Sequence, residues 1–441
     1  MFWGFVVNWR RLPRYLLLLF CYVVLAAFLV VSVLYVFLDY TTAGVLVAIF
    51  YPGIAPLLSL GFITCGVVII RFSFMRNLKG RIVVYGLCGF LFVSAVMPYA
   101  ALPLGVSAAE AEMVAQYGAD YLGLDTSQMR PVPFSVFDLL YGFPIDESRF
   151  SVETDIRYLD NGEDSFFFDW YKPVGAGPFP VVICLHGGGY VIGNKGVGNV
   201  IPFNKYLAQQ GYVVFDLQYG LFDIAAFEGD TFEFISLIGQ WRQFISPAYN
   251  RSYTIQEMVE NIGYFTQVLE QNSTRYHADM NNVFVVGRSA GAHMASIVTL
   301  GYKNSLFLGN FSSTMNITAG IWFYPPTNMG AMSSEFTDAL MAGSLPLEDQ
   351  YDKFSARYLI QNSTVVPPIM IVHGSKDKLV DYQTQGVDFV QYARSLGRVC
   401  LLITIPWGGH GFDINFQTYG GQMSTYNIER FMALVQLSGG P

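Results

Sequence analysis

The chain has 441 residues, enough for one large domain or for two to three ordinary ones. Hydrophobic residues make up 53% of it and charged residues 13%, whereas soluble proteins typically have roughly 45–50% and about 25%. Residues 1–110 hold 7 of the 25 Lys and Arg and 2 of the 33 Asp and Glu, which leaves 18 basic and 31 acidic residues in the rest. This composition indicates membrane segments near the N-terminus and argues against a nucleic-acid-binding surface on the acidic remainder.

Three apolar segments, at about 15–38, 43–70 and 82–104, form the N-terminal part of the chain. The first has 24 residues without a charge, which at about 1.5 Å per residue span roughly 36 Å and can cross a hydrocarbon layer of about 30 Å. It is longer than the roughly 7–15 apolar residues of a cleaved signal peptide. Pro52 and Pro56 predict a kink in the second segment. We therefore expect residues 1–104 to be a membrane anchor with three transmembrane helices.

The basic residues of this anchor predict its orientation. They form one cluster before the first span and one between the second and third: Arg10, Arg11 and Arg14, then Arg71, Arg76, Lys79 and Arg81. Such clusters favour the cytoplasmic side of a membrane. Because two spans separate the clusters, both can lie in the cytosol, and the third span then carries the chain out of it. The sequence thus predicts a multi-pass membrane protein whose C-terminal domain is extracellular or in the lumen of the secretory pathway.

Five N-x-S/T sequons follow residue 110, at Asn250, Asn272, Asn310, Asn316 and Asn362. Composition alone predicts roughly two in a region of this size. The excess favours a glycoprotein, with Asn316 the weakest sequon because it adjoins an expected strand. The alternative, accidental sequons in a bacterial protein, stays open.

Beyond the anchor, residues 105–150 mix Pro, Gly and short helical periodicity, which suggests a linker and an N-terminal cap element. From residue 151 to 441, runs typical of strands alternate with helix-compatible stretches. The expected strands are 156–159, 166–171, 180–185, 212–217, 283–286, 317–324, 368–372 and 399–405, and the expected helices include 201–210, 255–270, 292–300, 381–396 and 424–437. Such alternation predicts an α/β domain with a mainly parallel sheet and helices on both faces.

The strongest signal for a site lies in residues 282–295. An apolar strand leads into Gly-Arg-Ser-Ala-Gly, residues 287–291, and then into a helix. Glycines two positions before and after Ser289 allow the strand and helix backbones to pass close together at a strained turn. Such a turn exposes Ser289 Oγ and directs the N-terminus of the helix at an oxyanion formed there.

Three other strand ends carry candidate groups. The expected strand 180–185 ends at His186 and three glycines, whose backbone N–H groups can point into a site. Asp377 follows the strand 368–372, and His410 lies in a glycine-rich loop after the strand 399–405. An acid just beyond a sheet edge can orient an imidazole, which in turn can reach a serine. Asp381 competes with Asp377 as the acid, but its position predicts a helix cap.

The remaining histidines and the cysteines suggest no further chemistry. His186 and His373 are expected to brace their loops, His293 to be packed, and His277 to be solvent-exposed. The five cysteines form no disulfide framework, and no Cys/His/Asp cluster has metal-ligand spacing. Neither a dinucleotide-binding motif nor a P-loop occurs between a strand and a helix. We therefore expect no metal and no cofactor.

The motifs HGGGY, GRSAG, HGSKD and GGHGF, in this order, resemble the α/β-hydrolase superfamily. Within it they are similar to the HGGG esterases and lipases, which include hormone-sensitive-lipase-like and arylacetamide-deacetylase-like enzymes. The resemblance covers about residues 150–440 and implies a nucleophile, a base and an orienting acid at Ser289, His410 and Asp377. It also implies an oxyanion hole formed by the N–H groups of Gly188, Gly189 and Ala290. Residues 218–223 depart from the family pattern, and the three N-terminal spans lie outside it.

These features predict a membrane-anchored serine hydrolase that cleaves carboxylic esters through an acyl-serine intermediate, without a cofactor. The alternatives are a serine peptidase or amidase on the same fold and a non-catalytic, hydrolase-like adhesion ectodomain. Two segments, about 222–249 and 329–362, do not fit the core pattern and follow strands whose ends should face the site. Aromatic residues in the first segment suggest a lid over an apolar pocket. We therefore expect lipid-like or aryl esters as substrates.

Overall fold

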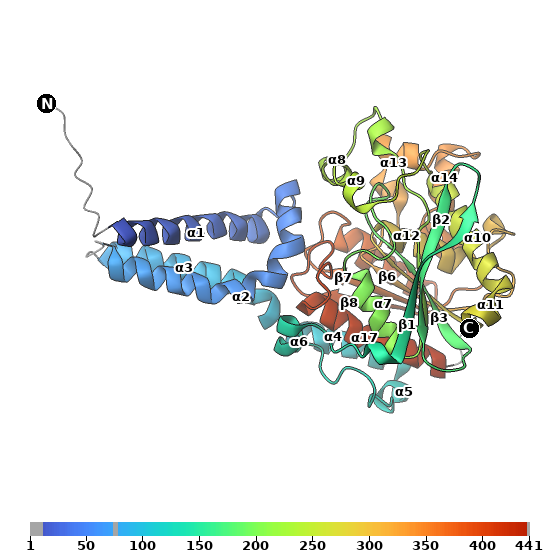
Figure 1. Ribbon diagram of the computed structural model, residues 1–441, viewed down its shortest axis with the longest axis horizontal. Coiled ribbons are helices and arrows are strands. Elements are labelled where there is room, and N and C mark those ends of the chain that lie inside the picture. The colour runs from blue at the N-terminus through green and yellow to red at the C-terminus, as the bar shows by residue number, and fades with distance from the viewer. Residues whose placement is uncertain (1–11, 74–77, 439–441) are drawn as a thin grey trace.

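The computed structural model describes residues 12–73 and 78–438. Figure 1 shows a bundle of long helices that projects from one side of an α/β domain. Arg14 near the start of the first helix donates a hydrogen bond to the carbonyl oxygen of Phe72, the last residue of the second helix, at 2.8 Å. This contact lies at the free end of the bundle. Arg10, Arg11 and Arg76 of the predicted cytoplasmic clusters lie outside the described residues.

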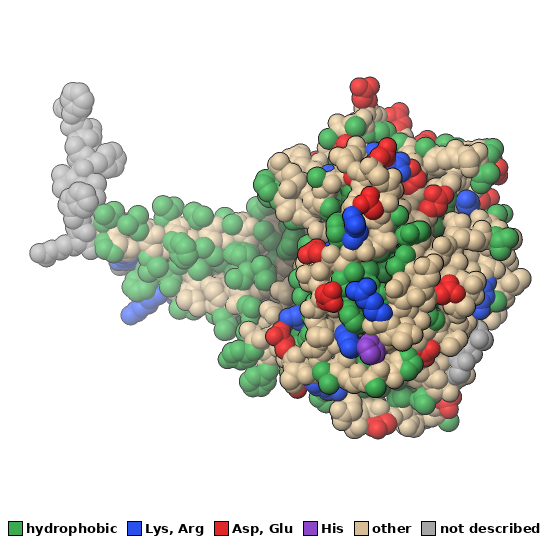
Figure 2. Space-filling view, turned by 45° about the vertical axis from the view of Figure 1, so that its right-hand side comes forward, with side chains coloured by type: hydrophobic (Ala, Val, Ile, Leu, Met, Phe, Trp, Pro, Cys, Tyr) green, Lys and Arg blue, Asp and Glu red, His purple; other side chains and the backbone are tan. Residues whose placement is uncertain are grey.

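The bundle consists of α1 (Leu12–Phe37), α2 (Thr42–Phe72) and α3 (Leu78–Ala100). Three helical segments in this region are long and apolar enough to cross a membrane, which confirms the expected number of candidate spans by length and composition. Their outward faces carry large apolar side chains, such as Leu60, which is 72% exposed. Figure 2 shows this hydrophobic surface along the projecting bundle.

Hydrogen bonds between buried polar side chains join the three helices. Ser32 Oγ of α1 lies 3.0 Å from Tyr51 OH of α2, and Ser94 Oγ of α3 donates to Ser32 Oγ at 3.0 Å. All three side chains are buried. In apolar surroundings such bonds fix how the helices are rotated against one another.

Helix α2 changes direction along its length, as its prolines predict. Pro52 and Pro56 lie inside the helix, where a proline removes a backbone hydrogen bond and produces a kink. Figure 1 shows the first turns of α2 along the α/β domain, whereas the rest of the helix runs beside α1 and α3. Helix α2 therefore belongs both to the bundle and to the domain.

The α/β domain is built on one sheet of eight strands in the order β1-β2-β4-β3-β5-β6-β7-β8. The strands are β1 (Phe150–Asp160), β2 (Ser165–Pro173), β3 (Phe179–Leu185), β4 (Val213–Leu217), β5 (Ala278–Arg288), β6 (Ile317–Phe323), β7 (Ile369–Gly374) and β8 (Cys400–Ile405). Strands β1 and β2 are antiparallel to their neighbours, and the pairs from β4 to β8 are parallel. The prediction of a mainly parallel sheet is confirmed, and each expected strand overlaps one of these.

Successive residues of the central strands are buried in opposite layers. In β3, Val181 and Ile183 belong to one core, and Val182 and Cys184 belong to the other. Burial on both faces explains why these strands are uninterrupted apolar runs. The first layer contains α10 (Ile255–Gln271), α11 (Ser273–Tyr276), α12 (Ala290–Gly301) and α16 (Asp388–Ser395), and the second contains α7 (Val200–Gln209) and α17 (Tyr419–Leu437).

Residues 105–150 cover one face of the sheet. Helix α4 (Leu102–Tyr117) packs against β8 and α17, and its Ala109 and Met113 are buried in the same core as α17. After it come the short helices α5 (Ala119–Leu122) and α6 (Val136–Tyr141). None of the residues 105–150 lines the cavities of the site described below. The segment packs as an outer layer of the domain, because its apolar positions bury against the sheet.

The segments 222–249 and 329–362 leave the sheet after β4 and β6. The first contains α8 (Glu233–Gly239) and α9 (Arg242–Ile245), and the second contains α13 (Glu335–Leu340), α14 (Leu347–Lys353) and α15 (Ala356–Asn362). The two insertions touch each other: the rings of Phe222 and Phe336 lie 5.7 Å apart, and the backbone N–H of Asp230 donates to Glu335 at 2.8 Å. Together they form one covering element over the carboxyl ends of the strands.

Candidate active site

The turn between β5 and α12 holds Ser289 in a conformation that few residues adopt. Its φ is 53° and its ψ is −120°, a strained combination for a residue with a side chain. A Cβ on Gly287 would lie 2.1 Å from the carbonyl oxygen of Gly291, and a Cβ on Gly291 would lie 2.3 Å from the carbonyl oxygens of Leu185 and His186. Close backbone approach therefore requires the two glycines that flank the serine.

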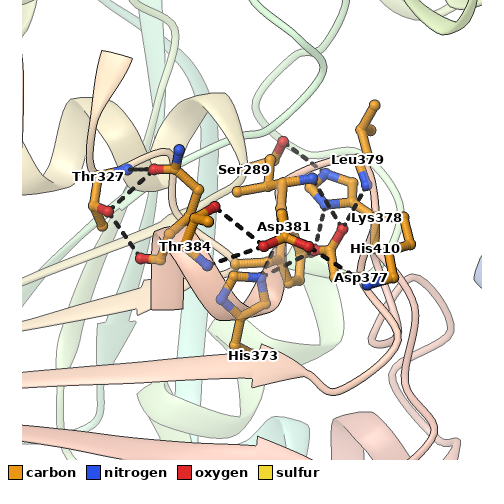
Figure 3. Close-up of polar contacts among 12 residues, drawn as sticks. Ser289, Thr327, His373, Asp377, Lys378, Leu379, Asp381, Thr384 and His410 are labelled. Carbon is orange, nitrogen blue, oxygen red and sulfur yellow. Dashed lines mark hydrogen bonds and ion pairs between the residues drawn. The ribbon is translucent and has the colours of Figure 1, made fainter. Parts of the chain in front are cut away.

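The loops after β7 and β8 bring Asp377 and His410 to this turn (Figure 3). His410 Nε2 lies 2.8 Å from Ser289 Oγ, and His410 Nδ1 lies 2.8 Å from Asp377 Oδ2. Asp377 and His410 are buried, while Ser289 is partly exposed. The three strands are parallel, so their carboxyl ends lie at the same edge of the sheet. The three residues singled out in the sequence thus form one hydrogen-bonded chain.

Hydrogen-bond donors surround the Asp377 carboxylate. Its Oδ1 accepts the backbone N–H groups of Leu379 and Val380, each at 3.0 Å, and its Oδ2 lies 3.2 Å from His373 Nε2. Burial raises the pKa of Asp377, but the charge of His410 and hydrogen bonds from both imidazoles outweigh burial and bring the pKa below its usual value. Asp377 is therefore ionised at neutral pH. His373 braces this loop, as expected, and also contacts the acid itself.

Asp381, the competing acid, caps the segment that follows. Its Oδ1 accepts the backbone N–H of Thr384 at 2.9 Å, at the start of the π-helical turn Tyr382–Val387. Its Oδ2 lies 3.5 Å from Lys378 Nζ. The expected capping position of Asp381 agrees with this geometry, and Asp377 is the carboxylate that reaches His410.

The glycine-rich loop after β3 lies beside Ser289. A Cβ on Gly187 would lie 3.5 Å from Ser289 Cβ. Gly188 and Gly189 have φ values of 122° and 58°, which favour glycine. Among residues 12–73 and 78–438, no protein acceptor takes the backbone N–H of Gly188, Gly189 or Ala290. These residues border the same space as Ser289, so the three N–H groups are available to an oxygen atom bound there.

The other histidines have structural roles close to those expected. His186 Nδ1 lies 2.9 Å from the carbonyl oxygen of Gly187 and braces the glycine loop. His293 is fully buried, with its Nδ1 3.0 Å from Tyr190 OH. Burial lowers the pKa of both imidazoles to about 4, so both are neutral near pH 7. His277, expected to be exposed, is partly exposed.

A buried network that sequence reasoning missed supports His410. Arg288 Nε donates to Asp413 Oδ2 at 2.6 Å, and Tyr324 OH donates to Asp413 Oδ1 at 2.7 Å. The ring of Tyr324 packs against the imidazole of His410, with ring centres 4.6 Å apart. Because Arg288 directly precedes Ser289, the network joins the serine turn to the His410 loop. The one available sequence signal is Asp413, an acid three positions after His410.

Two cavities meet at Ser289. The first, of about 280 Å³, lies beneath the two insertions, and its apolar walls include Phe232, Phe234 and Ile235 of one and Met329, Met332 and Phe336 of the other. The second, of about 350 Å³, runs along Gly187–Gly189 and passes His410 and Ile414. The expected apolar pocket under the insertions therefore has a counterpart in the structure, and a second cavity accompanies it.

The described residues 12–73 and 78–438 contain no group of three or more His, Cys, Asp or Glu that could hold a metal ion. The five cysteines lie within these ranges and are unpaired. Cys184 and Cys400 are buried inside β3 and β8, and burial raises the pKa of the Cys400 thiol to about 12. Both act as small apolar residues of the core.

The five sequons differ in accessibility. Asn250 and Asn362 are exposed, whereas Asn272, Asn310 and Asn316 are partly buried. All five lie on the α/β domain, beyond the third helix of the bundle. Asn250 and Asn362 are therefore the sequons best placed to carry a glycan.

Comparisons with known proteins agree with this arrangement. A family model described as BD-FAE matches residues 249–392. An acetylxylan esterase of Xylanibacter ruminicola is 27% identical over 150 residues, which cover 33% of this chain and 29% of that protein. Esterase LipC of Mycobacterium tuberculosis is 23% identical over 255 residues, 55% of each chain. The chain thus spans less than two thirds of the length of these relatives.

Among solved structures, the crystal structure of Esterase B from Lactobacillus rhamnosis aligns with a TM-score of 0.51 and 19% identity. The alignment covers 78% of this chain and 98% of that one. Because the identity is low, the likeness shows a shared fold.

The network behind His410 predicts a large stability difference between two carboxylate variants. Asp413→Ala leaves the buried Arg288 guanidinium without its carboxylate, which is expected to cost about 3–5 kcal/mol of unfolding free energy. The control Glu147→Ala breaks an ion pair with Lys205 in which the glutamate side chain is 70% exposed, and should cost about 0–1 kcal/mol. Thermal unfolding of the detergent-solubilised proteins measures both. Equal losses in the two variants would contradict the stabilising role of the buried Arg288–Asp413 pair.

Proposed function

We propose that the chain is a member of the α/β-hydrolase superfamily and a membrane-anchored serine hydrolase that cleaves carboxylic esters through an acyl-serine intermediate. The observation that carries the proposal is the hydrogen-bonded chain Ser289–His410–Asp377, whose serine borders two apolar cavities. The relatives reported above are named as esterases. That shared description favours an ester over a peptide or amide as substrate.

In this mechanism His410 moves the proton and Ser289 makes the covalent bond. His410 Nε2, 2.8 Å from Ser289 Oγ, takes the hydroxyl proton as the oxygen attacks the ester carbonyl. The ionised Asp377 orients the imidazole and stabilises its protonated form. His410 then donates the proton to the departing alcohol. In the second half-reaction it activates a water molecule that releases the acid and restores Ser289.

We assign the oxyanion of the tetrahedral intermediate to the backbone N–H groups of Gly188, Gly189 and Ala290. These groups have no acceptor among the described residues of the protein and border the space at Ser289. The N-terminus of α12, which begins at Ala290, adds a favourable dipole for negative charge. Loss of one such donor typically costs about 10²–10³ in rate.

The cavity beneath the insertions supports a lipid-like or aryl acyl group. Its walls are mainly aromatic and aliphatic, and each CH₂ group buried from water contributes about 0.8 kcal/mol. An acetyl group would leave most of the 280 Å³ unfilled. We therefore expect longer or aromatic acyl groups to be preferred.

The proposal places the α/β domain outside the cytosol. Arg14 and Arg71 lie near the free end of the bundle, and the domain lies at its opposite end. Basic residues favour the cytoplasmic side, so the domain would be extracellular or in the lumen of the secretory pathway. The exposed sequons Asn250 and Asn362 on the domain are consistent with this orientation.

Ser289→Ala is expected to reduce the turnover of p-nitrophenyl butyrate by about 10⁶-fold, because the nucleophile is lost. Asp377→Asn should cost about 10⁴-fold, since the imidazole loses its orienting charge. Asp381→Asn is the matched control and should have a small effect. Steady-state hydrolysis and fluorophosphonate labelling measure these changes. Labelling that persists in Ser289→Ala, or faster cleavage of the matched anilide by the wild-type protein, would reject the esterase mechanism.

Met332→Trp should fill the cavity beneath the insertions and lower the kcat/KM ratio of a palmitate ester to an acetate ester by about tenfold. The control is Leu345→Trp in the same insertion, whose side chain is 41% exposed and outside both cavities. It should leave the ratio unchanged. If the two variants shift the ratio equally, the acyl group does not occupy this cavity.

When the protein is produced in a eukaryotic host, endoglycosidase treatment should increase its electrophoretic mobility. The double variant Asn250→Gln/Asn362→Gln should lose most of this shift, because these are the exposed sequons. The predicted orientation is wrong if no shift occurs and the α/β domain is digested only by protease added to the cytosolic side.

A further inference from the structure

The membrane anchor contributes a wall to the second cavity at Ser289. Leu46, Ile49 and Phe50 of α2 line it, together with the glycine loop after β3. These residues lie in the first turns of the helix, before Pro52. Residues far apart in the sequence, one set in the anchor and one in the α/β domain, therefore enclose the same space next to the reactive oxygen.

The first turns of α2 are firmly seated on the domain. A Cβ on Gly409 would lie 2.6 Å from Ala48 Cβ, so the helix touches the loop that carries His410. At the start of the helix, Thr42 Oγ1 donates to Glu233 of α8 in the first insertion. The first turns of α2, which form this wall of the cavity, thus contact both the His410 loop and the first insertion.

Helix α1 and the turn after it attach the anchor to the loop that carries His410 and to the loop that carries Asp377. Tyr35 OH donates to the carbonyl oxygen of Trp407 at 2.8 Å, three residues before His410. Asp39 Oδ2 lies 3.0 Å from Lys376 Nζ, next to Asp377 in sequence. The side chains of this ion pair are only 15% and 17% exposed. The position of α2 relative to Ser289 is therefore part of the folded structure.

The length of α2 beyond its prolines would place the second cavity at the surface of the membrane. The rest of the 31-residue helix, residues 54–72, is about 28 Å long, which matches a hydrocarbon layer of about 30 Å. Residues 42–53 then lie at the surface of that layer, against the domain. Phe50 in the cavity wall is also 55% exposed, so the apolar lining continues onto the outer surface of the protein beside the candidate spans.

The position of His410 indicates which half of an ester enters this cavity. In the proposed mechanism the imidazole delivers a proton to the departing alcohol oxygen, so the alcohol must lie on the side of His410. His410 lines the second cavity and is absent from the walls of the first. The second cavity therefore receives the alcohol half and the first receives the acyl half.

We propose that the anchor helix α2 is a substrate-binding element, and that the alcohol half of the substrate is a lipid alcohol drawn from the membrane into the cavity beside it. This inference rests on the proposed esterase function. The bond from the carbonyl carbon to Ser289 Oγ forms, the bond to the alcohol oxygen breaks, and the serine proton passes through His410 to that oxygen. The freed lipid alcohol leaves along α2, where its chain is already in contact with the bilayer.

The test compares esters that differ in one half only. Hexadecyl butyrate, ethyl palmitate and ethyl butyrate are offered in the same mixed micelles to the full-length protein. Ile49→Trp should lower the kcat/KM ratio of hexadecyl butyrate to ethyl butyrate by about tenfold, because the indole narrows the second cavity. It should leave the ratio of ethyl palmitate to ethyl butyrate unchanged. Met332→Trp should show the reverse pattern.

Leu60→Trp is the control for the substitution, because it places an indole on the same helix at an outward position, 72% exposed, away from both cavities. Both ratios should stay at their wild-type values in this variant. Fluorophosphonate labelling of Ser289 reports whether each variant is folded, and Leu46→Phe replaces Ile49→Trp if the latter is not labelled.

Two results would overturn the inference. If Ile49→Trp changes the palmitate ratio instead, the two cavities hold the opposite halves of the ester. If neither ratio changes in Ile49→Trp or Leu46→Phe, α2 does not contact the substrate. Failure of the esterase proposal is a separate result, since the wild-type protein would then hydrolyse none of the three esters and Ser289 would not be labelled.

Discussion

The close approach of the α12 N-terminus to the end of β3 is the constraint on which the site depends. Gly291 lies against the carbonyl oxygens of Leu185 and His186, where a Cβ would be 2.3 Å away. This contact brings the strained Ser289 turn and the glycine loop after β3 to one place. N–H groups from both, which have no acceptor among the described residues, therefore border the space at Ser289. Any side chain at Gly291 would separate the helix from the strand, and the proposed oxyanion site would lose its shape.

Sequence reasoning succeeded where the relevant signals are local. Ser289, Asp377 and His410 each follow an apolar strand, and parallel strands bring their carboxyl ends to one edge, so order and spacing were enough to place them together. Asp377 and Asp381 could be separated because capping of the next helix depends on neighbours only a few residues away. The three candidate spans followed from hydropathy, and the kink in α2 followed from its prolines.

The features that the sequence did not reveal depend on long-range contacts. Arg288 and Asp413 are 125 residues apart, and the proximity of Asp413 to His410 in the sequence does not indicate that its partner is Arg288. Residues 105–150 bury apolar positions against the sheet, but a short amphipathic helix gives the same pattern whether it covers a sheet or a site. The sequence also does not show that Ile49 lines a cavity, because an isoleucine has the same hydropathy whether it faces lipid or a cavity.

A cavity that opens to a bilayer must select its ligand differently from one that opens to water. Transfer of a hydrocarbon chain from water into an apolar site contributes about 0.8 kcal/mol of binding free energy per CH₂ group. A lipid hydrocarbon chain that comes from the membrane is already out of water, so its transfer contributes almost none of this free energy. The remaining favourable contribution to binding is van der Waals contact between the hydrocarbon chain and the cavity wall, the same kind of contact that packs helices together in a membrane. Discrimination among membrane esters would then depend on the shape of the space between α2 and the His410 loop. That shape is set by the seating of the anchor on the domain, through Tyr35 on Trp407 and Asp39 on Lys376, so the same contacts that join anchor to domain would determine which lipid alcohol fits.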